Sequence, residues 1–241
     1  MLAIKNNHLI DAVLGGFFEA GGYMKMEVRS YTRPAKSGGS IHLTSVTPIV
    51  GYSDSNNKKL LYLKSLFGGG IHKEKDKNSV RWYIKSRKIT PLLEAIQRYA
   101  PSWQTFIEEF YNWSVAEDVE TKVEIAKGIN RMSNPQPRDR VSVEEYRKFV
   151  AIPQFLAGVF EARGALYKSI RPDNLLDSPI IAIHSQNYNL LRAIQEKYGG
   201  GINNTLRKRD RSLTYVLGKH QSQKFLEEIK PYLFSSFVIS P

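Results

Sequence analysis

The sequence contains no cysteine among its 241 residues, and this absence excludes several kinds of site. Without thiols the chain forms no disulfide, no cysteine-ligated zinc finger and no thiol nucleophile. No apolar run reaches the roughly 18 residues that a membrane-spanning helix needs. Residues 1–7 lack both the apolar segment of a secretory signal and the Arg- and Ser-rich character of a transit peptide. We therefore expect a protein without a membrane partner that is used in the compartment where it is made.

Acidic residues are scarce relative to basic ones. The chain has 35 Lys and Arg against 23 Asp and Glu, which gives a net charge of +12 at pH 7. This balance favours an anionic partner such as nucleic acid, with plain solubility charge as the competing interpretation. An apolar content of 41% and a charged content of 24% are ordinary for a globular protein. The composition therefore indicates a folded, basic protein.

The sequence repeats itself internally. Residues 47–71 align without gaps with residues 178–202, and the aligned segments share Pro48 with Pro179 and a Gly-Gly-Gly-Ile run. Two further matches flank this segment in the same order in both halves, namely 14–22 with 156–164 and 93–96 with 226–229. Three collinear matches indicate a duplicated structural unit rather than chance similarity. We expect the first repeat in residues 1–132, a Pro-rich linker in 133–141 and the second repeat in 142–241.

Each half is predicted to fold in the order α-β-β-α-β-β-α. In the first half these elements are a helix at 8–20, strands at 24–33 and 40–46, a helix at 56–66, strands at 71–75 and 79–85, and a helix from Thr90. In the second half they are a helix at 153–162, strands at 165–170 and 180–184, a helix at 187–198, strands at 202–207 and 212–217, and a helix at 222–229. Amphipathic helices are also expected at 103–115 and 121–132. Ser142 and Glu145 have the spacing of a capping box, which predicts another helix start.

The two nonapeptides at 14–22 and 156–164, together with the Gly-Gly-Gly-Ile runs and the Arg-Trp-Tyr-Ile segment at 81–84, resemble the LAGLIDADG homing endonucleases and maturases in their single-chain, two-motif form. The resemblance covers most of the chain. It implies an α+β fold in a monomer, with two pseudo-twofold-related repeats, motif helices paired at the centre and antiparallel sheets forming a saddle over nucleic acid. Small residues on the motif helices would permit close packing, and they are Gly16, Ala20, Gly158 and Ala162.

The resemblance also implies that the penultimate motif residue is an acidic metal ligand. Those positions here are Gly21 and Arg163, and neither supplies the oxygen ligand that Mg²⁺ requires. Glu19 and Glu161 lie two residues earlier, about 200° around each helix, so we expect them to point away from the helix seam. Glu27 as a replacement ligand is the less favoured alternative. Because phosphodiester hydrolysis in this family depends on the metal, we predict no catalytic residue, no metal, no cofactor and no double-strand cleavage.

Strand alternation predicts a basic binding face, with Val80, Trp82 and Ile84 turned into the core. Its candidate residues in the first half are Lys25, Arg29, Tyr31, Arg33, His72, Lys73, Lys75, Lys77, Arg81, Tyr83, Lys85 and Arg87. Those in the second half are Arg163, Lys168, Arg171, Arg207, Lys208, Arg209, Arg211 and Lys219. Lys and Arg would neutralise phosphates. Tyr31 and Tyr83 are candidates for stacking, although packing is the commoner role of a strand tyrosine.

The class of nucleic acid stays open. The resemblance favours RNA over DNA, because some family members take up RNA roles while losing cleavage. The chain would then be an intron maturase or a structural protein of a ribonucleoprotein such as an organellar ribosome. The alternative is a site-specific DNA-binding homing endonuclease that is inactive or weakly active. Family habit implies an organelle, with the mitochondrion favoured over the chloroplast, or a microbial cytoplasm.

Overall fold

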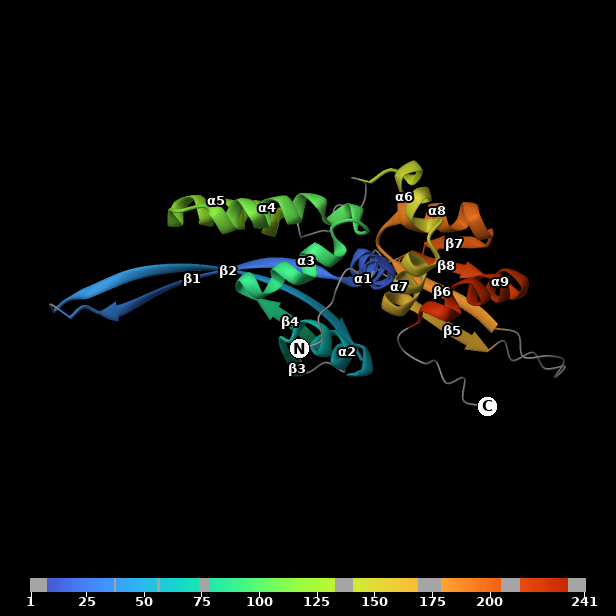
Figure 1. The fold of residues 1–241 in the computed structure, drawn as a ribbon, viewed down its shortest axis with the longest axis horizontal. Helices are drawn as coiled ribbons and strands as arrows, with labels where there is room; N and C mark the ends of the chain where they lie inside the picture. The colour runs from blue at the N-terminus through green and yellow to red at the C-terminus, as the bar shows by residue number, and fades with distance from the viewer. Residues whose placement is uncertain are drawn as a thin grey trace. The chain divides into compact units, whose positions relative to one another are not determined.

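The computed structural model describes residues 8–36, 38–55, 57–73, 79–132, 141–168, 179–204 and 213–233. Within these ranges the chain forms two four-stranded antiparallel sheets with helices packed on them (Figure 1). None of the described helices is long and apolar enough to cross a membrane. The chain divides into two compact units. We call Met1–Gly21, Ala95–Ser102 and Arg138–Pro241 the helix-pair unit, and Gly22–Glu94 and Trp103–Pro137 the ribbon unit.

The ribbon unit is built on the first sheet. Its elements are β1 (Tyr23–Pro34), β2 (Ser40–Asp54), α2 (Asn57–Phe67), β3 (Gly70–Lys73), β4 (Val80–Lys85), a 3-10 turn (Ser86–Ile89), most of α3 (Thr90–Ile96), α4 (Gln104–Val115) and α5 (Val119–Met132). The strand order is β1-β2-β4-β3. The predicted alternation in β1 is confirmed near its start, where Met24 and Met26 are buried and Lys25 between them is exposed. Further along, both faces of the β1–β2 ribbon are largely exposed.

Strand β2 continues well past the predicted end at Val46, and it does so through a proline. Pro48 lies opposite Met26 of β1, and the ladder between β2 and β4 begins only at Ile49. The N–H that proline lacks is therefore not needed by either ladder. On the outer edge of β1, the side-chain amide of Asn130 in α5 takes the place of a strand. It accepts from Met26 N and donates to Met26 O, each at 2.8 Å, which closes an edge that would otherwise be open.

The helix-pair unit contains the second sheet and both motif helices. Its elements are α1 (His8–Gly21), α6 (Val143–Val150), α7 (Pro153–Arg163), β5 (Gly164–Lys168), β6 (Pro179–Ser185), α8 (Tyr188–Tyr198), β7 (Gly201–Asn204), β8 (Leu213–Leu217), α9 (Lys219–Ile229) and a 3-10 turn (Lys230–Tyr232). The strand order β5-β6-β8-β7 repeats that of the first sheet, so the predicted duplication is confirmed. Helix α6 starts as the capping box predicts, with Ser142 Oγ accepting from Glu145 N at 3.1 Å.

The compact units are divided differently from the sequence repeats. The predicted linker at 133–141 separates the two repeats along the chain and lies mostly outside the described residues. Helix α1 belongs to the first repeat, yet it packs against α7 of the second repeat and so joins the helix-pair unit. Helix α1 packs on α7 in this way because both motif helices carry small residues on one face.

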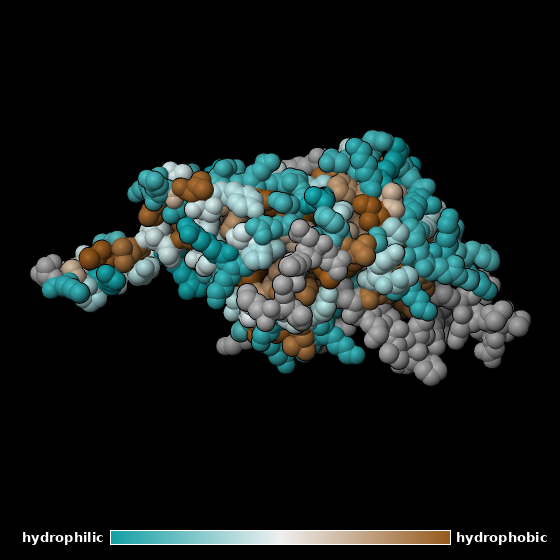
Figure 2. All heavy atoms as spheres, viewed as in Figure 1, coloured by the Kyte–Doolittle hydropathy of each residue, from teal (hydrophilic) through white to brown (hydrophobic). Residues whose placement is uncertain are grey.

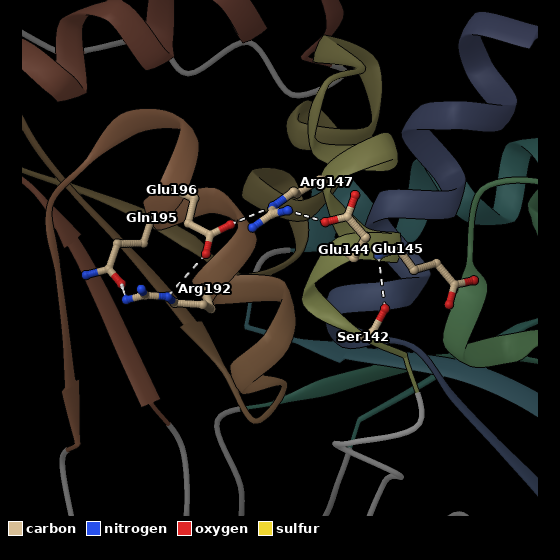
Figure 3. Close-up of polar contacts among 7 residues, drawn as sticks. All are labelled: Ser142, Glu144, Glu145, Arg147, Arg192, Gln195 and Glu196. Carbon is tan, nitrogen blue, oxygen red and sulfur yellow. Dashed lines mark hydrogen bonds and ion pairs between the residues drawn. The ribbon is translucent and has the colours of Figure 1, made fainter.

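Glutamates neutralise the basic residues on the surface formed by α6 and α8 (Figure 3). Arg147 Nε lies 2.8 Å from Glu196 Oε2, and the same guanidinium pairs with Glu144. Arg192 Nε lies 3.5 Å from Glu196 Oε1. Hydrophilic residues cover this part of the molecule in Figure 2. Exposed ion pairs of this kind contribute little stability each, and the surface has the character of an ordinary solvated helix face.

A small apolar patch lies at the turn between α4 and α5. Val115 is 76% exposed and Val119 is 41% exposed, and apolar residues gather at this end of the helix pair in Figure 2. The inner faces of the same helices are buried, with Phe110 and Trp113 of α4 in ring contact. The patch therefore lies at the rim of α4 and α5, which are otherwise ordinary amphipathic helices.

Candidate nucleic-acid interface and paired helix ends

Helices α1 and α7 approach each other at backbone distance. A Cβ atom on Gly16 would lie 1.9 Å from Phe155 O, and a Cβ atom on Gly158 would lie 1.9 Å from Val13 O. Neither position has room for any side chain, because the obstacle is backbone of the opposite helix. Ala20 and Ala162, one turn further along, are buried as well. The predicted small-residue face is thus the contact surface of the two motif helices.

The C-terminal ends of these helices carry Gly21 and Arg163. Arg163 Nε donates a hydrogen bond to Ala20 O at 3.2 Å, so the side chain that ends α7 caps the last turn of α1. A helix C-terminus presents carbonyl groups with a partial negative charge, and a nearby guanidinium stabilises it. The sequence predicted the loss of the two acidic positions, but it did not predict that the replacing arginine bonds to the neighbouring helix.

Glu19 is committed to the interior of the helix-pair unit. It is 3% exposed, accepts a hydrogen bond from Ser102 N at 3.1 Å, and accepts another from the hydroxyl of Tyr146. Asn187 Nδ2 in turn donates to Tyr146 Oη at 2.5 Å. Burial raises the pKa of Glu19 to about 7, although the hydrogen bonds oppose that rise. Glu161, the corresponding residue of α7, is also buried.

The residues at the helix ends therefore do not fit a divalent metal. Gly21 has no side chain, Arg163 is a cation, and the oxygens of Glu19 are turned to Ser102 and Tyr146. Among the described residues, no group of three or more Asp, Glu, His or Cys side chains is placed to hold a metal ion. Hard cations such as Mg²⁺ require oxygen ligands, and this site presents a guanidinium instead.

A row of four residues crosses the exposed face of the first sheet. The pairing places Tyr23 beside Gly51, Gly51 beside Tyr83, and Tyr83 beside Gly70. A Cβ atom on Gly51 would lie 2.4 Å from Tyr23 Oη, and one on Gly70 would lie 3.0 Å from the Tyr83 ring. The glycines thus let both tyrosine rings lie down on the sheet, which is a recognised use of glycine within strands.

Cations flank these rings. The Arg81 guanidinium lies 5.5 Å from the Tyr23 ring centroid, and Lys85 Nζ lies 5.3 Å from the Tyr83 ring centroid. Both distances are within the range of cation–π attraction. The face therefore combines aromatic surface with positive charge, which is the combination that nucleic-acid surfaces use for sugars, bases and phosphates.

Glu27 is the one acidic side chain of this face among the described strand residues. Arg29 Nη2 lies 2.8 Å from Glu27 Oε1, and Lys85 Nζ lies 3.4 Å from Glu27 Oε2. The hydrogen bond from Arg29, with the nearby charge of Lys85, lowers the pKa of Glu27. Glu27 thus forms ion pairs with two cations on the sheet. These contacts give no support to Glu27 as a replacement metal ligand.

The pairing assigns the predicted binding residues to faces. The exposed face of the first sheet, here called the basic face, carries Lys25, Arg29, Tyr31, Arg33, His72, Arg81, Tyr83 and Lys85. Lys73 pairs with Val80, so it lies on the opposite face of the sheet. The prediction that Lys73 shares a face with His72 was therefore wrong, because successive strand residues point to opposite faces. Tyr23 and Gly51 were missed, although a tyrosine at the start of the alternating strand was the available signal.

The remaining candidates lie apart from the basic face or outside the described residues. Arg87 is exposed in the turn after β4, next to Ser86, whose φ of 61° is unusual for a residue with a side chain. Lys219 is the exposed first residue of α9. Only the backbone of Lys168 is described, paired with Pro179. The predicted residues outside the described ranges are Lys75, Lys77, Arg171, Arg207, Lys208, Arg209 and Arg211.

The second sheet presents a different exposed face. Ala165, Ala182 and Val216 stand where the first sheet has Tyr23, Gly51 and Tyr83. The next row has Thr214 beside His184, with His184 Nδ1 and Thr214 Oγ1 3.1 Å apart. Over the strand residues whose side chains the structure describes, this face carries hydrogen-bonding groups in place of Lys and Arg. The two repeats therefore share topology but differ in surface chemistry.

Comparison with solved structures identifies the fold as that of the single-chain LAGLIDADG homing endonucleases. I-SmaMI bound to an uncleaved DNA target in the presence of calcium ions matches with a TM-score of 0.62 and 19% identity, over 94% of this chain and 86% of that chain. I-GzeII in complex with its DNA target matches with a TM-score of 0.57 and 15% identity, over 91% and 84%. No protein-family model matches the sequence, and no curated protein does so. The α+β fold implied by the nonapeptide motifs is thereby confirmed.

Proposed function

We propose that this chain binds a nucleic-acid duplex through the basic face and does not cleave it. The observation that carries the proposal is the charge of that face. Among the described strand residues, this face holds Lys25, Arg29, Arg33, Arg81 and Lys85 against the single carboxylate of Glu27. On α6 and α8, in contrast, the arginines are matched by glutamates. An excess of cations on one open sheet is the electrostatic footprint of a phosphate-binding surface.

The absence of cleavage is proposed from the helix ends. Hydrolysis of a phosphodiester requires a nucleophilic water and neutralisation of developing negative charge, which a divalent metal supplies in metal-dependent nucleases. Gly21 and Arg163 offer that metal no side-chain oxygen, and Glu19 is engaged in the interior. A guanidinium can bind a phosphate, but it generates no hydroxide.

Duplex DNA is the first candidate partner. Strands β1 and β2 pair over the whole of β1, from Tyr23 to Pro34, as a regular two-stranded ribbon. The major groove of B-form DNA admits such a ribbon, whereas the major groove of A-form RNA is too narrow and deep for side chains to read. The matched solved structures were also in complex with DNA. This geometry supports DNA more than the sequence alone did.

An RNA role is the second candidate, as an intron maturase or as a structural protein of a ribonucleoprotein. The observation that favours it is the replacement of both acidic motif positions by Gly21 and Arg163 while the helix packing is kept. Such a pattern suits a protein retained for binding alone. Loops and shape would then replace groove reading.

The test is selection of bound sequences from random DNA duplexes and from structured RNA, using the full purified chain. We expect enrichment of a DNA sequence, and we expect the double variant K25Q/R33Q to lose affinity and to lower the salt slope by about two phosphates. Arg147→Gln is the matched control, because Arg147 is paired with glutamates on α6 and α8. Enrichment of RNA alone would select the second candidate. Equal losses in K25Q/R33Q and R147Q, or no binding to either nucleic acid, would overturn the proposal.

A further inference from the structure

Arg163 is held in place by the helix that it touches. Its Nε donates to Ala20 O at 3.2 Å, at the C-terminal end of α1. A guanidinium has five N–H donors in a planar fork, and this bond uses one of them. The residue is nevertheless exposed. One nitrogen therefore fixes the group. Within the part of the chain that the structure describes, no hydrogen bond uses its two terminal nitrogens, which form a bidentate donor pair.

The partners of Arg163 distinguish it from the other arginines that the structure describes in the helix-pair unit. Arg147 and Arg192 pair with glutamates. Arg98 contacts His8 at 3.2 Å and acts on the charge of Asp11. Arg163 has a backbone carbonyl as its hydrogen-bond partner, and no described carboxylate forms an ion pair with it. Its charge is thus not consumed by a side chain of opposite sign.

The location also explains why a fixed cation is stable there. The C-terminal ends of α1 and α7 both present carbonyl groups with partial negative charge, and a cation near them is favourable. A guanidinium keeps its charge throughout the physiological pH range and needs no bound ion to supply it. The same charge repels a divalent cation and attracts an oxyanion. The planar fork matches two oxygens of a phosphate group.

We propose that the Arg163 guanidinium binds a phosphodiester group at the paired ends of α1 and α7, in place of a divalent metal, so that nucleic-acid binding by this chain is independent of metal ions. This inference rests on the proposed function, because the phosphodiester belongs to the bound nucleic acid. Ala20 O positions the guanidinium, and the terminal nitrogens make the contact.

The experiment measures the affinity of the full chain for its selected duplex at several salt concentrations, in EDTA and in Ca²⁺. The wild-type chain is expected to bind with the same Kd, within twofold, in both. Arg163→Gln removes the charge but keeps an amide that can bond to Ala20 O. It is expected to weaken binding about tenfold and to lower the salt slope by about one phosphate. Arg192→Gln, on the α8 surface, is the control and is expected to bind as wild type does.

Arg163→Lys separates charge from geometry. It keeps the cation and loses the fork, so it should retain the salt slope while weakening binding about threefold to tenfold. It also serves if Arg163→Gln fails to fold, which thermal unfolding would show. Wild-type binding that requires Ca²⁺, or Arg163→Gln and Arg163→Lys variants with unchanged affinity and salt slope, would overturn this inference alone. A wild-type chain that binds no nucleic acid would instead overturn the proposed function.

Discussion

Gly16 and Gly158 occupy reciprocal positions in the contact between α1 and α7, each against the backbone of the opposite helix. A Cβ atom on either would lie 1.9 Å from a carbonyl oxygen, of Phe155 and of Val13 respectively. No rotamer change relieves such a clash, because both atoms are fixed by helical backbone. The helix pair is therefore defined by two glycines, and it places the ends of α1 and α7 together.

The first prediction concerns this contact. Gly158→Ala is expected to lower the free energy of unfolding by about 3 kcal/mol or more, because the two helices must separate to admit the methyl group. Gly128→Ala in α5 is the matched control, since a Cβ atom there meets nothing within 4 Å. The control should raise stability by about 0.5 to 1 kcal/mol through helix propensity. Urea denaturation measures both, and equal effects of the two substitutions would refute the packing argument.

The second prediction is a pH dependence carried by Glu19. Its pKa rises from an ordinary value of 4.5 to about 7 in the folded chain, chiefly because the carboxyl is buried. Between these values the folded state holds a proton that the unfolded state releases, so this group makes stability fall as the pH rises from about 4.5 to about 7. A rise of the pKa from 4.5 to about 7 corresponds to a loss of about 3 kcal/mol at most.

Glu19→Gln isolates this effect. The amide keeps a polar group at the position next to Ser102 and Tyr146 but does not titrate. The difference in unfolding free energy between wild type and Glu19→Gln should therefore shift in favour of the variant as the pH rises from 5 to 8. Chemical denaturation at those two pH values provides the measurement. A constant difference would show that Glu19 is ionised in the folded chain throughout.

The third prediction restores oxygen ligands at the helix ends. In the double variant G21D/R163D, two carboxylates replace a hydrogen atom and a guanidinium at the ends of α1 and α7. We expect this variant to bind Mn²⁺ measurably by titration calorimetry, because carboxylates suit hard divalent ions. The wild-type chain should show no heat of binding at the same concentrations. If the variant binds no better than wild type, the helix ends lack the geometry for a metal for reasons beyond residue type.

The fourth prediction is that, of the two sheets, only the first contributes to the salt dependence of binding. The double variant N203A/T214A removes hydrogen-bonding groups from the exposed face of the second sheet without changing charge. It is expected to weaken binding to the selected sequence while leaving the salt slope unchanged. K25Q/R33Q should do the opposite and lower the slope on every sequence. Salt titrations by fluorescence anisotropy compare the two, and a reduced slope in N203A/T214A would contradict this division.

Much of the architecture followed from patterns that sequence displays directly. Collinear repeats predicted the duplicated sheet order, and the buried pair Met24 and Met26 followed from alternation. Register did not follow. Lys73 was assigned to the wrong face, because β3 begins at Gly70 and one residue of phase decides the face. The predicted β2 ended before Pro48, whereas the strand continues through this proline. Pro48 is tolerated because the pairing of β2 with β4 begins at Ile49, and the sequence does not show that pairing.

At the candidate site, too, residue types could be predicted from the sequence and contacts between distant residues could not. The loss of acidic residues at Gly21 and Arg163 was readable from the motifs, since it concerns residue type alone. The hydrogen bond from Arg163 to Ala20 O and the burial of Glu19 against Tyr146 join residues 143 and 127 positions apart in the chain. Such contacts depend on how α1 packs against α7 and α6. They are properties of the fold, and they turn the carboxylate of Glu19 toward Ser102 and Tyr146.

Binding without cleavage is tested most directly by a cleavage assay on the nucleic acid that the chain binds. The full chain, in excess over its selected duplex, is incubated with Mg²⁺ or Mn²⁺ under conditions where binding is complete, and the products are separated on a denaturing gel. We expect both strands to stay intact in both metals, because the ends of α1 and α7 carry Gly21 and Arg163. A metal-dependent nick or double-strand break at the bound site would contradict this expectation.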